Sequence, residues 1–205
     1  LPKGEPQNKA LRTELVRDAA GRLVEKRTTA HHYHYAYDAL DQLVRAQKLA
    51  VQADGSLKPL YTSTFAYDTA GNVIEETATD ETTRQSHTLR HSHDALGNRT
   101  QTQLPTLPGQ PHLQRALNYL HYGSGHLHQI NYSQRDTRSP DALAVHQLIS
   151  DIERDALHRE IHRTQGQVQT RYALDPLGRR QGAWSQPIDQ RSPCLLYTSD
   201  AADEE

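Results

Sequence analysis

The sequence has 205 residues, of which 35% are hydrophobic, with one Phe, one Trp and no Met, and this composition argues against a thick globular core. The formal net charge is -2, and the sequence contains no basic block of the kind that indicates a nucleic-acid partner. No stretch approaches the roughly 18 consecutive apolar residues of a membrane-spanning helix. The single Cys194 excludes a disulfide framework, and the absence of an initiator Met leads us to expect a piece of a longer chain.

From residue 11 onward, one short pattern recurs: an Asp, two variable residues and a Gly, followed by a strand-like stretch. Asp at the first position of a type I turn accepts hydrogen bonds from nearby backbone N–H groups, and Gly at the fourth position takes the left-handed conformation. The pattern therefore predicts a three-residue β-hairpin loop. Its copies are Asp18/Gly21, Asp38/Asp41, Asp68/Gly71, Asp94/Gly97, Tyr122/Gly125, Asp155/His158 and Asp175/Gly178.

Two copies carry Asp41 and His158 in place of Gly, and both residue types are among those found most often at positive φ after Gly. Pro176 occupies the second position of the last turn, where its fixed φ suits a type I turn. Successive first positions are 20 to 33 residues apart, which leaves room for two strands and a return loop in each unit. Periods of this length indicate a repeat architecture whose units stack on their neighbours. We read all of these turn residues as structural.

The flanking segments alternate as strands do. Tyr33, Tyr35 and Tyr37 fall on one face of a predicted strand and His32 and His34 on the other, and we interpret the tyrosines as a packing ladder. Residues 53–56 predict a return loop with an Asp-Gly turn, residues 77–90 predict two strands around a loop at Asp80, and the Pro-rich residues 104–111 predict a surface loop.

Residues 139–164 give conflicting signals. Ser139 and Pro140 resemble a helix start, and the following residues are rich in helix formers. The repeat, however, places a turn at Asp155–His158 within this segment. Agreement with the global pattern outweighs a weak local propensity, so we predict strands from Leu148 onward, with a short helical turn near Pro140 as an alternative.

The end of the chain departs from the pattern. Residues 192–205 carry four acidic and no basic residues, contain no repeat and include the run CLLYTSDAADE, which resembles a translated sequencing adapter. We expect these residues to be a non-native tail. Residues 1–191 then form one repeat segment, with the repeats between about residues 11 and 184.

Thirteen His residues raise the question of a metal site. The best cluster in the sequence is His121, His126 and His128, because His126 and His128 share one face of a predicted strand. No Cys lies nearby and no carboxylate is closer in the sequence than Asp136, so the ligand set is incomplete. We therefore predict no metal, no cofactor and no catalytic residue. We interpret His31, His32 and His34 as part of the sheet surface.

The units YDTAGNVIEET, HDALGNRTQT and LDPLGRRQGAW, together with YGSGHLHQI and SDIERDALHREIHRTQG, resemble the RHS/YD-repeat family, and bacterial Rhs proteins in particular. The resemblance covers residues 11–184. It implies an all-β fold in which repeated hairpins form part of a spiralling sheet. The resemblance also implies that this sheet forms a hollow shell around a C-terminal toxin domain.

The resemblance further implies that the partners are the adjoining repeats and the toxin of the same chain, with a secretion apparatus, and that the location is secreted or at the bacterial surface. The motif that closes such a shell by self-cleavage is not present, and we read Asp175-Pro176 as a turn. An extracellular adhesive or carbohydrate-binding YD-repeat segment and a His-dependent metal hydrolase are the alternatives.

Overall fold

The computed structural model describes residues 12–139, 145–189 and 194–198, the last of these by its backbone. All of the regular structure in these residues is β-strand, and none of it is helix, which confirms the predicted all-β class. The strands form one antiparallel sheet whose order follows the sequence. They are β1 (Glu14–Arg17), β2 (Leu23–Arg27), β3 (His31–Tyr37), β4 (Leu43–Val51), β5 (Leu57–Tyr67), β6 (Val73–Asp80), β7 (Gln85–His93), β8 (Arg99–Gln103), β9 (Leu113–His121), β10 (Leu127–Asp136), β11 (Val145–Arg154), β12 (Glu160–Gln165), β13 (Val168–Leu174), β14 (Arg180–Pro187) and β15 (Cys194–Thr198).

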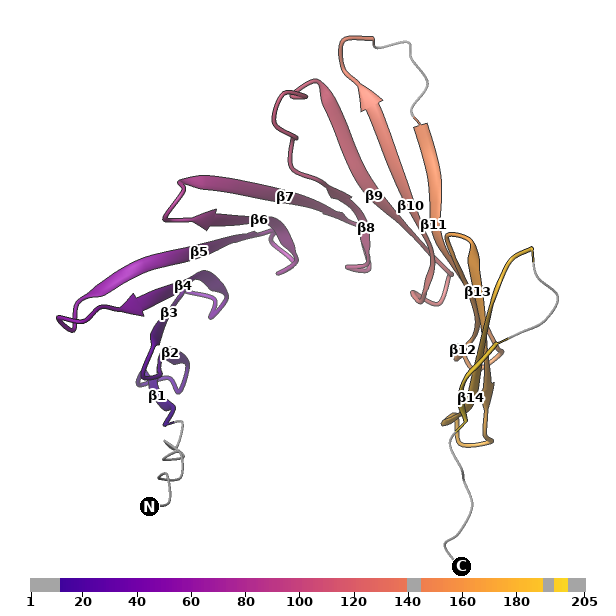
Figure 1. The fold of residues 1–205 in the computed structure, drawn as a ribbon, viewed down its shortest axis with the longest axis horizontal. Coiled ribbons are helices and arrows are strands. Elements are labelled where there is room, and N and C mark those ends of the chain that lie inside the picture. The colour runs from indigo at the N-terminus through magenta and orange to yellow at the C-terminus, as the bar shows by residue number, and fades with distance from the viewer. Residues whose placement is uncertain (1–11, 140–144, 190–193, 199–205) are drawn as a thin grey trace, which may run out of the picture. The chain divides into compact units, whose positions relative to one another are not determined.

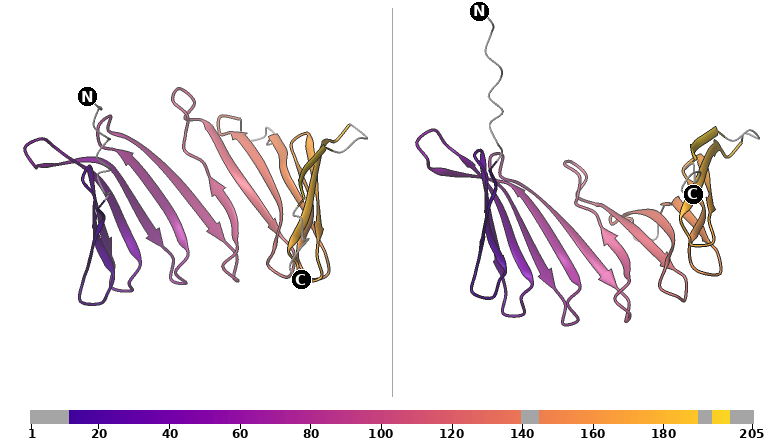
Figure 2. Two further views of the ribbon diagram at one scale, coloured as in Figure 1. Left: turned by 60° about the horizontal axis from the view of Figure 1, so that its bottom comes forward. Right: turned by 90° about the horizontal axis from the view of Figure 1, so that it is seen from below.

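The chain divides into two units, residues 1–90 and 91–205, with the boundary inside β7. Within each unit, strands that are consecutive in the sequence pair with each other (Figure 1). Figure 2 shows the strands of each unit side by side in a single layer. In the described part of the chain, no helix is long and apolar enough to cross a membrane.

The hairpins are built on one turn geometry. At the fourth turn position the backbone is left-handed in every copy, including the two copies without Gly: φ is 62° at Asp41 and at His158, and 79–85° at the five Gly residues. The register shifts by one residue beside the turn in six of the seven hairpins, for example between Ala66 and Tyr67. The extra residue is the seventh counted from the first turn position, Ile74 in this hairpin, so the shift is a β-bulge three residues beyond the left-handed Gly71.

The sheet has very little apolar core. Among the described residues, Leu49 and Ile152 are the only buried hydrophobic side chains, whereas Thr62, Thr102 and Ser150 are buried polar ones. Cross-strand hydroxyl pairs connect the strands instead, such as Thr77 with Thr88 at 2.8 Å. This agrees with the expectation drawn from composition, because a single layer has no second layer against which to bury a hydrophobic face.

The segment with conflicting signals is β-structure. β11 and β12 span most of residues 145–165 and are joined by the turn at Asp155–His158, so the prediction of strands is confirmed, and β11 begins three residues before Leu148. The alternative of a helical turn concerns Pro140, which lies outside the described residues. Within the expected tail, Cys194–Thr198 form β15, which pairs with β14.

Candidate functional site

The hairpin turns place a row of Asp carboxylates along the sheet. In each of the six turns that begin with Asp, Oδ1 accepts the backbone N–H of the fifth turn residue at 2.8–3.0 Å. The backbone N–H of the fourth residue donates to the carbonyl of the first, at 2.8–3.3 Å across all seven turns. The structure thus places Asp18, Asp38, Asp68, Asp94, Asp155 and Asp175 at turn position one, and Gly21, Asp41, Gly71, Gly97, Gly125, His158 and Gly178 at position four.

The side chain of the fifth turn residue donates a hydrogen bond to the second oxygen of the Asp carboxylate. Arg22 Nε donates to Asp18 Oδ2 at 2.7 Å, Asn72 Nδ2 donates to Asp68 Oδ2 at 3.0 Å, and the same contact occurs at Asp94, Asp155 and Asp175. These donors lower the pKa of Asp18 and Asp175 below the usual value, chiefly through the guanidinium groups of Arg22 and Arg179. An ionised carboxylate whose two oxygens are both engaged stabilises a turn.

The same fifth residue also reaches the fourth position of the next turn. Arg22 donates to Asp41, the side chain of Arg159 lies 3.1 Å from the place that a Cβ on Gly178 would occupy, and the ring of His126 stacks on that of His158 at 4.6 Å. Gln42 and Asn98 lie in the same way beside Gly71 and Gly125. Within each unit, consecutive turns are therefore in side-chain contact.

A second inter-repeat contact starts from the residue before the turn. Tyr37 Oη donates to the carbonyl of Leu23 at 2.9 Å, Tyr67 Oη donates to that of Leu43 at 2.7 Å, and Arg154 Nε donates to that of Leu127 at 3.3 Å. In each case the acceptor is the sixth residue of the preceding repeat. A Tyr directly before the Asp therefore fastens one hairpin to the previous one.

The histidines that stood out in the sequence do not form one cluster. His126 contacts Ser124 and His158, whereas His128 Nδ1 lies 3.5 Å from Asp151 Oδ1 and its ring lies 4.5 Å from that of Tyr122. The expectation that His126 and His128 share a face of one strand is wrong, because His126 precedes β10 and the register shifts between Leu127 and Gln129.

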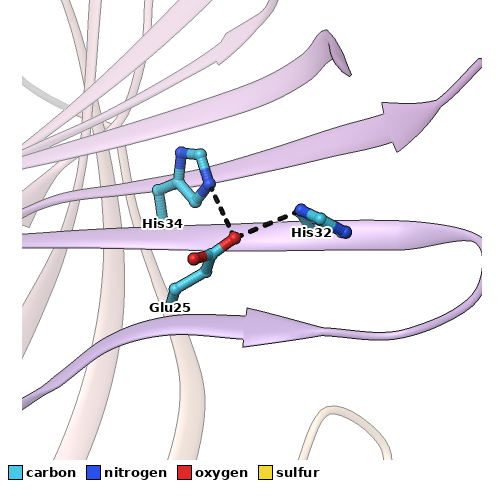
Figure 3. A group of neighbouring side chains, drawn as sticks. All are labelled: Glu25, His32 and His34. Carbon is cyan, nitrogen blue, oxygen red and sulfur yellow. Dashed lines mark hydrogen bonds and ion pairs between the residues drawn. The ribbon is translucent and has the colours of Figure 1, made fainter. Parts of the chain in front are cut away.

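The structure brings together a different set, Glu25, His32 and His34. Each of these residues offers one ligand atom, and the three atoms lie within 4.8 Å of one another. Glu25 Oε1 is 3.2 Å from His32 Nδ1 and 3.3 Å from His34 Nε2 (Figure 3). The two His residues are two apart on β3 and so share a face, and Glu25 on β2 pairs directly with His34.

The surroundings keep Glu25 ionised. Arg27 Nη2 binds its other oxygen, Oε2, at 2.6 Å, and this contact lowers the pKa of Glu25 from 4.5 to about 2. Oε1 is left facing the two imidazoles. Glu25 is 16% exposed, His32 22% and His34 42%, so the group is half-buried and open to solvent on one side.

Sequence reasoning placed His32 and His34 on one face but missed Glu25. Regular alternation from the turn could not have identified it. The register shift in the β1–β2 pair falls between Leu23 and Glu25 and places these two residues on opposite faces of β2. The length of the return loop, residues 28–30, decides which residue of β2 lies beside His34, and the repeat pattern does not specify that length.

Comparison with known proteins gives one informative similarity. No protein-family model matches the chain. The chain is 33% identical over 175 residues to the double-stranded DNA deaminase toxin A of Burkholderia cenocepacia (strain H111). The match takes in 84% of this chain but only 10% of that toxin, so the chain corresponds to a small part of its length.

Solved structures give only distant likenesses. A porin-like protein from Bacteroides uniformis has a TM-score of 0.34 and 12% identity, with 91% of this chain and 92% of that chain covered. A DUF3836 family protein from Parabacteroides distasonis has a TM-score of 0.25 and 13% identity, with 58% of this chain and 88% of that chain covered. Scores this low carry no functional argument, and the similarity that counts is to part of the double-stranded DNA deaminase toxin A.

Proposed function

We propose that this chain is a wall segment of an Rhs-type toxin protein. In this role the sheet forms part of a β-shell that encloses a C-terminal toxin domain and carries it to a target cell. The segment itself has no catalytic activity. Its partners are the adjoining repeats and the toxin domain of the same longer chain, with a secretion apparatus as the delivery machinery, and its location is secreted or at the bacterial surface.

The observation that carries this proposal is the match to the deaminase toxin. It takes in most of this chain but a tenth of the toxin, so the larger part of that protein, in which an enzyme domain has ample room, lies outside the match. A repeat region that accompanies an enzyme without containing its active site is what a container requires. The repeated Asp-turn motif and its resemblance to RHS/YD repeats point the same way.

The side-chain contacts support a wall because they are devoted to joining repeats. Turn carboxylates and fifth-position donors are engaged with their own or the neighbouring hairpin. So are the Tyr and Arg residues that precede four of the turns, Arg17, Tyr37, Tyr67 and Arg154. The polar faces of the sheet suit contact with water on one side and with an enclosed protein on the other.

An adhesive or carbohydrate-binding segment is the second candidate, and a metal hydrolase built on histidines is the third. The hydrolase has one observation in its favour, the Glu25–His32–His34 group. The adhesive candidate rests on the repeat class alone. Both differ from the container in needing no companion toxin domain.

The test is an exchange of segments. The matching 175-residue stretch of the Burkholderia toxin is replaced by the corresponding residues of this chain, and the digestion of the C-terminal part by trypsin is followed. We expect the hybrid to protect that part as well as the parent toxin does. A matched hybrid carrying Gly71→Val and Gly125→Val, which strain two turns, should lose the protection.

Two results would count against the proposal. One is a folded hybrid, with the β-sheet circular dichroism of the parent, whose C-terminal part is digested at the rate of the free domain. The other is turnover of a nuclease, protease or glycosidase substrate by the 205-residue chain itself, with or without zinc, that is lost on His34→Ala.

A further inference from the structure

We propose that Glu25, His32 and His34 bind a divalent transition-metal ion that joins β2 to β3, with Zn²⁺ as the ion that fits best. This inference is independent of the proposed wall function. It concerns three side chains for which the turn and inter-repeat contacts provide no role.

The distances agree with a tetrahedral zinc site. Zinc binds imidazole nitrogen and carboxylate oxygen at about 2.0–2.2 Å, and ligands on a tetrahedron of that size lie about 3.3–3.5 Å apart. Glu25 Oε1 stands 3.2 Å from His32 Nδ1 and 3.3 Å from His34 Nε2, which corresponds to two edges of such a tetrahedron. The two imidazole ligand atoms lie within 4.8 Å of each other, and the more exposed His34 ring has room to close that edge.

The state of His32 Nδ1 favours an ion over a simple hydrogen bond. This atom is buried and has no hydrogen-bond partner, although Glu25 Oε1 is only 3.2 Å away. A buried polar atom that points at a carboxylate without a hydrogen bond is costly unless something between the two satisfies both. A cation at the centre of the three ligand atoms would do so.

The chemistry of the ligands selects the class of ion. Two imidazoles and one carboxylate suit zinc and its neighbours in the first transition row, whereas calcium and magnesium prefer sites made of oxygen atoms alone. Arg27 fixes the carboxylate through Oε2 and leaves Oε1 directed at the imidazoles, which is an outer contact of the kind that orients metal ligands.

Access and the protein ligand count are also suitable. His32 lines a surface pocket of about 300 Å³ together with Glu14, Thr28 and Thr29, which gives an ion a path from solvent. Three protein ligands leave one tetrahedral position for water. Because the ligands come from two strands, the bound ion should hold β2 and β3 together.

The test is metal binding by the whole 205-residue chain, with Zn²⁺ measured by competition with a chromophoric chelator and Co²⁺ by its visible absorption spectrum. We expect one equivalent that is lost in His32→Ala, in His34→Ala and in Glu25→Gln, with an affinity at least about 100-fold weaker in each. His31→Ala is the matched control, because His31 is the adjacent histidine of β3 and lies 6.4 Å from the ring of Tyr33, on the opposite face. This variant should retain the equivalent.

A second measurement does not depend on any variant folding. Hydrogen exchange of the unmodified chain with and without Zn²⁺ should show added protection in peptides that cover residues 23–37, and little elsewhere. Protection confined to His126, His128 or the C-terminal residues would overturn the proposal. So would a Zn²⁺ stoichiometry and a Co²⁺ spectrum that are the same in His32→Ala, His34→Ala and the unmodified chain.

Discussion

The turn at Tyr122–Gly125 contains two glycines whose substitution by Ala should have opposite effects. Gly125 is at the fourth position with φ of 79°, whereas Gly123 is at the second position, outside the left-handed region, and a Cβ there would meet nothing within 4 Å. A Cβ on Gly125 would lie 3.4 Å from Asn98 Oδ1, an ordinary contact, so neighbouring atoms add little to its cost.

The magnitudes follow from the backbone alone. An L-residue in the left-handed region costs about 1–2 kcal/mol, so Gly125→Ala should destabilise the hairpin by that amount. Gly123→Ala should stabilise it by about 0.4–1 kcal/mol, because Ala restricts the unfolded chain and fits the native φ. Gly125→Asn should fall between them, as Asp41 and His158 are accommodated at the same position in other turns.

Hydrogen exchange read by mass spectrometry on peptides that span β9 and β10 measures the local opening. Exchange should accelerate about 5- to 30-fold in Gly125→Ala and slow about 2- to 5-fold in Gly123→Ala. Equal effects of the two substitutions, or no effect of Gly125→Ala, would refute the assignment of position four as the conformationally demanding one.

Three further predictions concern packing, pH and the sheet edges. Gly182→Ala should destabilise β14 by about 1–3 kcal/mol, because the new Cβ would lie 2.8 Å from Trp184, and a shift in Trp184 fluorescence should accompany the loss in urea melts. Arg138 lowers the pKa of Asp136 from 3.8 to about 2, so the pKa in the folded state is below that in the unfolded state. The contact therefore stabilises the fold above about pH 4, and this stabilisation is lost as the pH falls towards 2. The corresponding part of the acid unfolding curve should vanish in Asp136→Asn. Among the described strands, β1 pairs with β2 alone, so the isolated chain should self-associate through this edge. A monodisperse monomer with a sharp melt would contradict this.

Much of the fold could be predicted because one local motif dictates it. The Asp at position one and a residue tolerant of positive φ at position four specify the turn within five residues, and the choice of Asp41 and His158 at that position is intelligible from backbone preference alone. The spacing of the turns also predicted strands for residues 145–164, although the composition of this segment favours a helix. That outcome shows that a repeat constrains each copy more strongly than its own composition does.

The candidate site could not be predicted because it depends on contacts between repeats. His126 and His128 are two residues apart and would lie on one face of a regular strand, but the β-bulge between Leu127 and Gln129 interrupts the alternation. Glu25 meets His34 only through the register of the β2–β3 pair, which a return loop of unspecified length sets. The role of the Tyr before the Asp also emerged only once the acceptor in the preceding hairpin was known.

The contact between the fifth residue of one turn and the fourth of the next has a consequence for how such a chain tolerates changes in length. Consecutive turns are 20 to 33 residues apart in sequence, yet within each unit these contacts hold neighbouring turns side by side. Differences in length must therefore be absorbed at the opposite ends of the hairpins, as in residues 104–112 between β8 and β9. Residues can be inserted into these return loops during evolution, and a reporter peptide can be inserted there by experiment. In both cases the contacts between neighbouring turns should be unchanged.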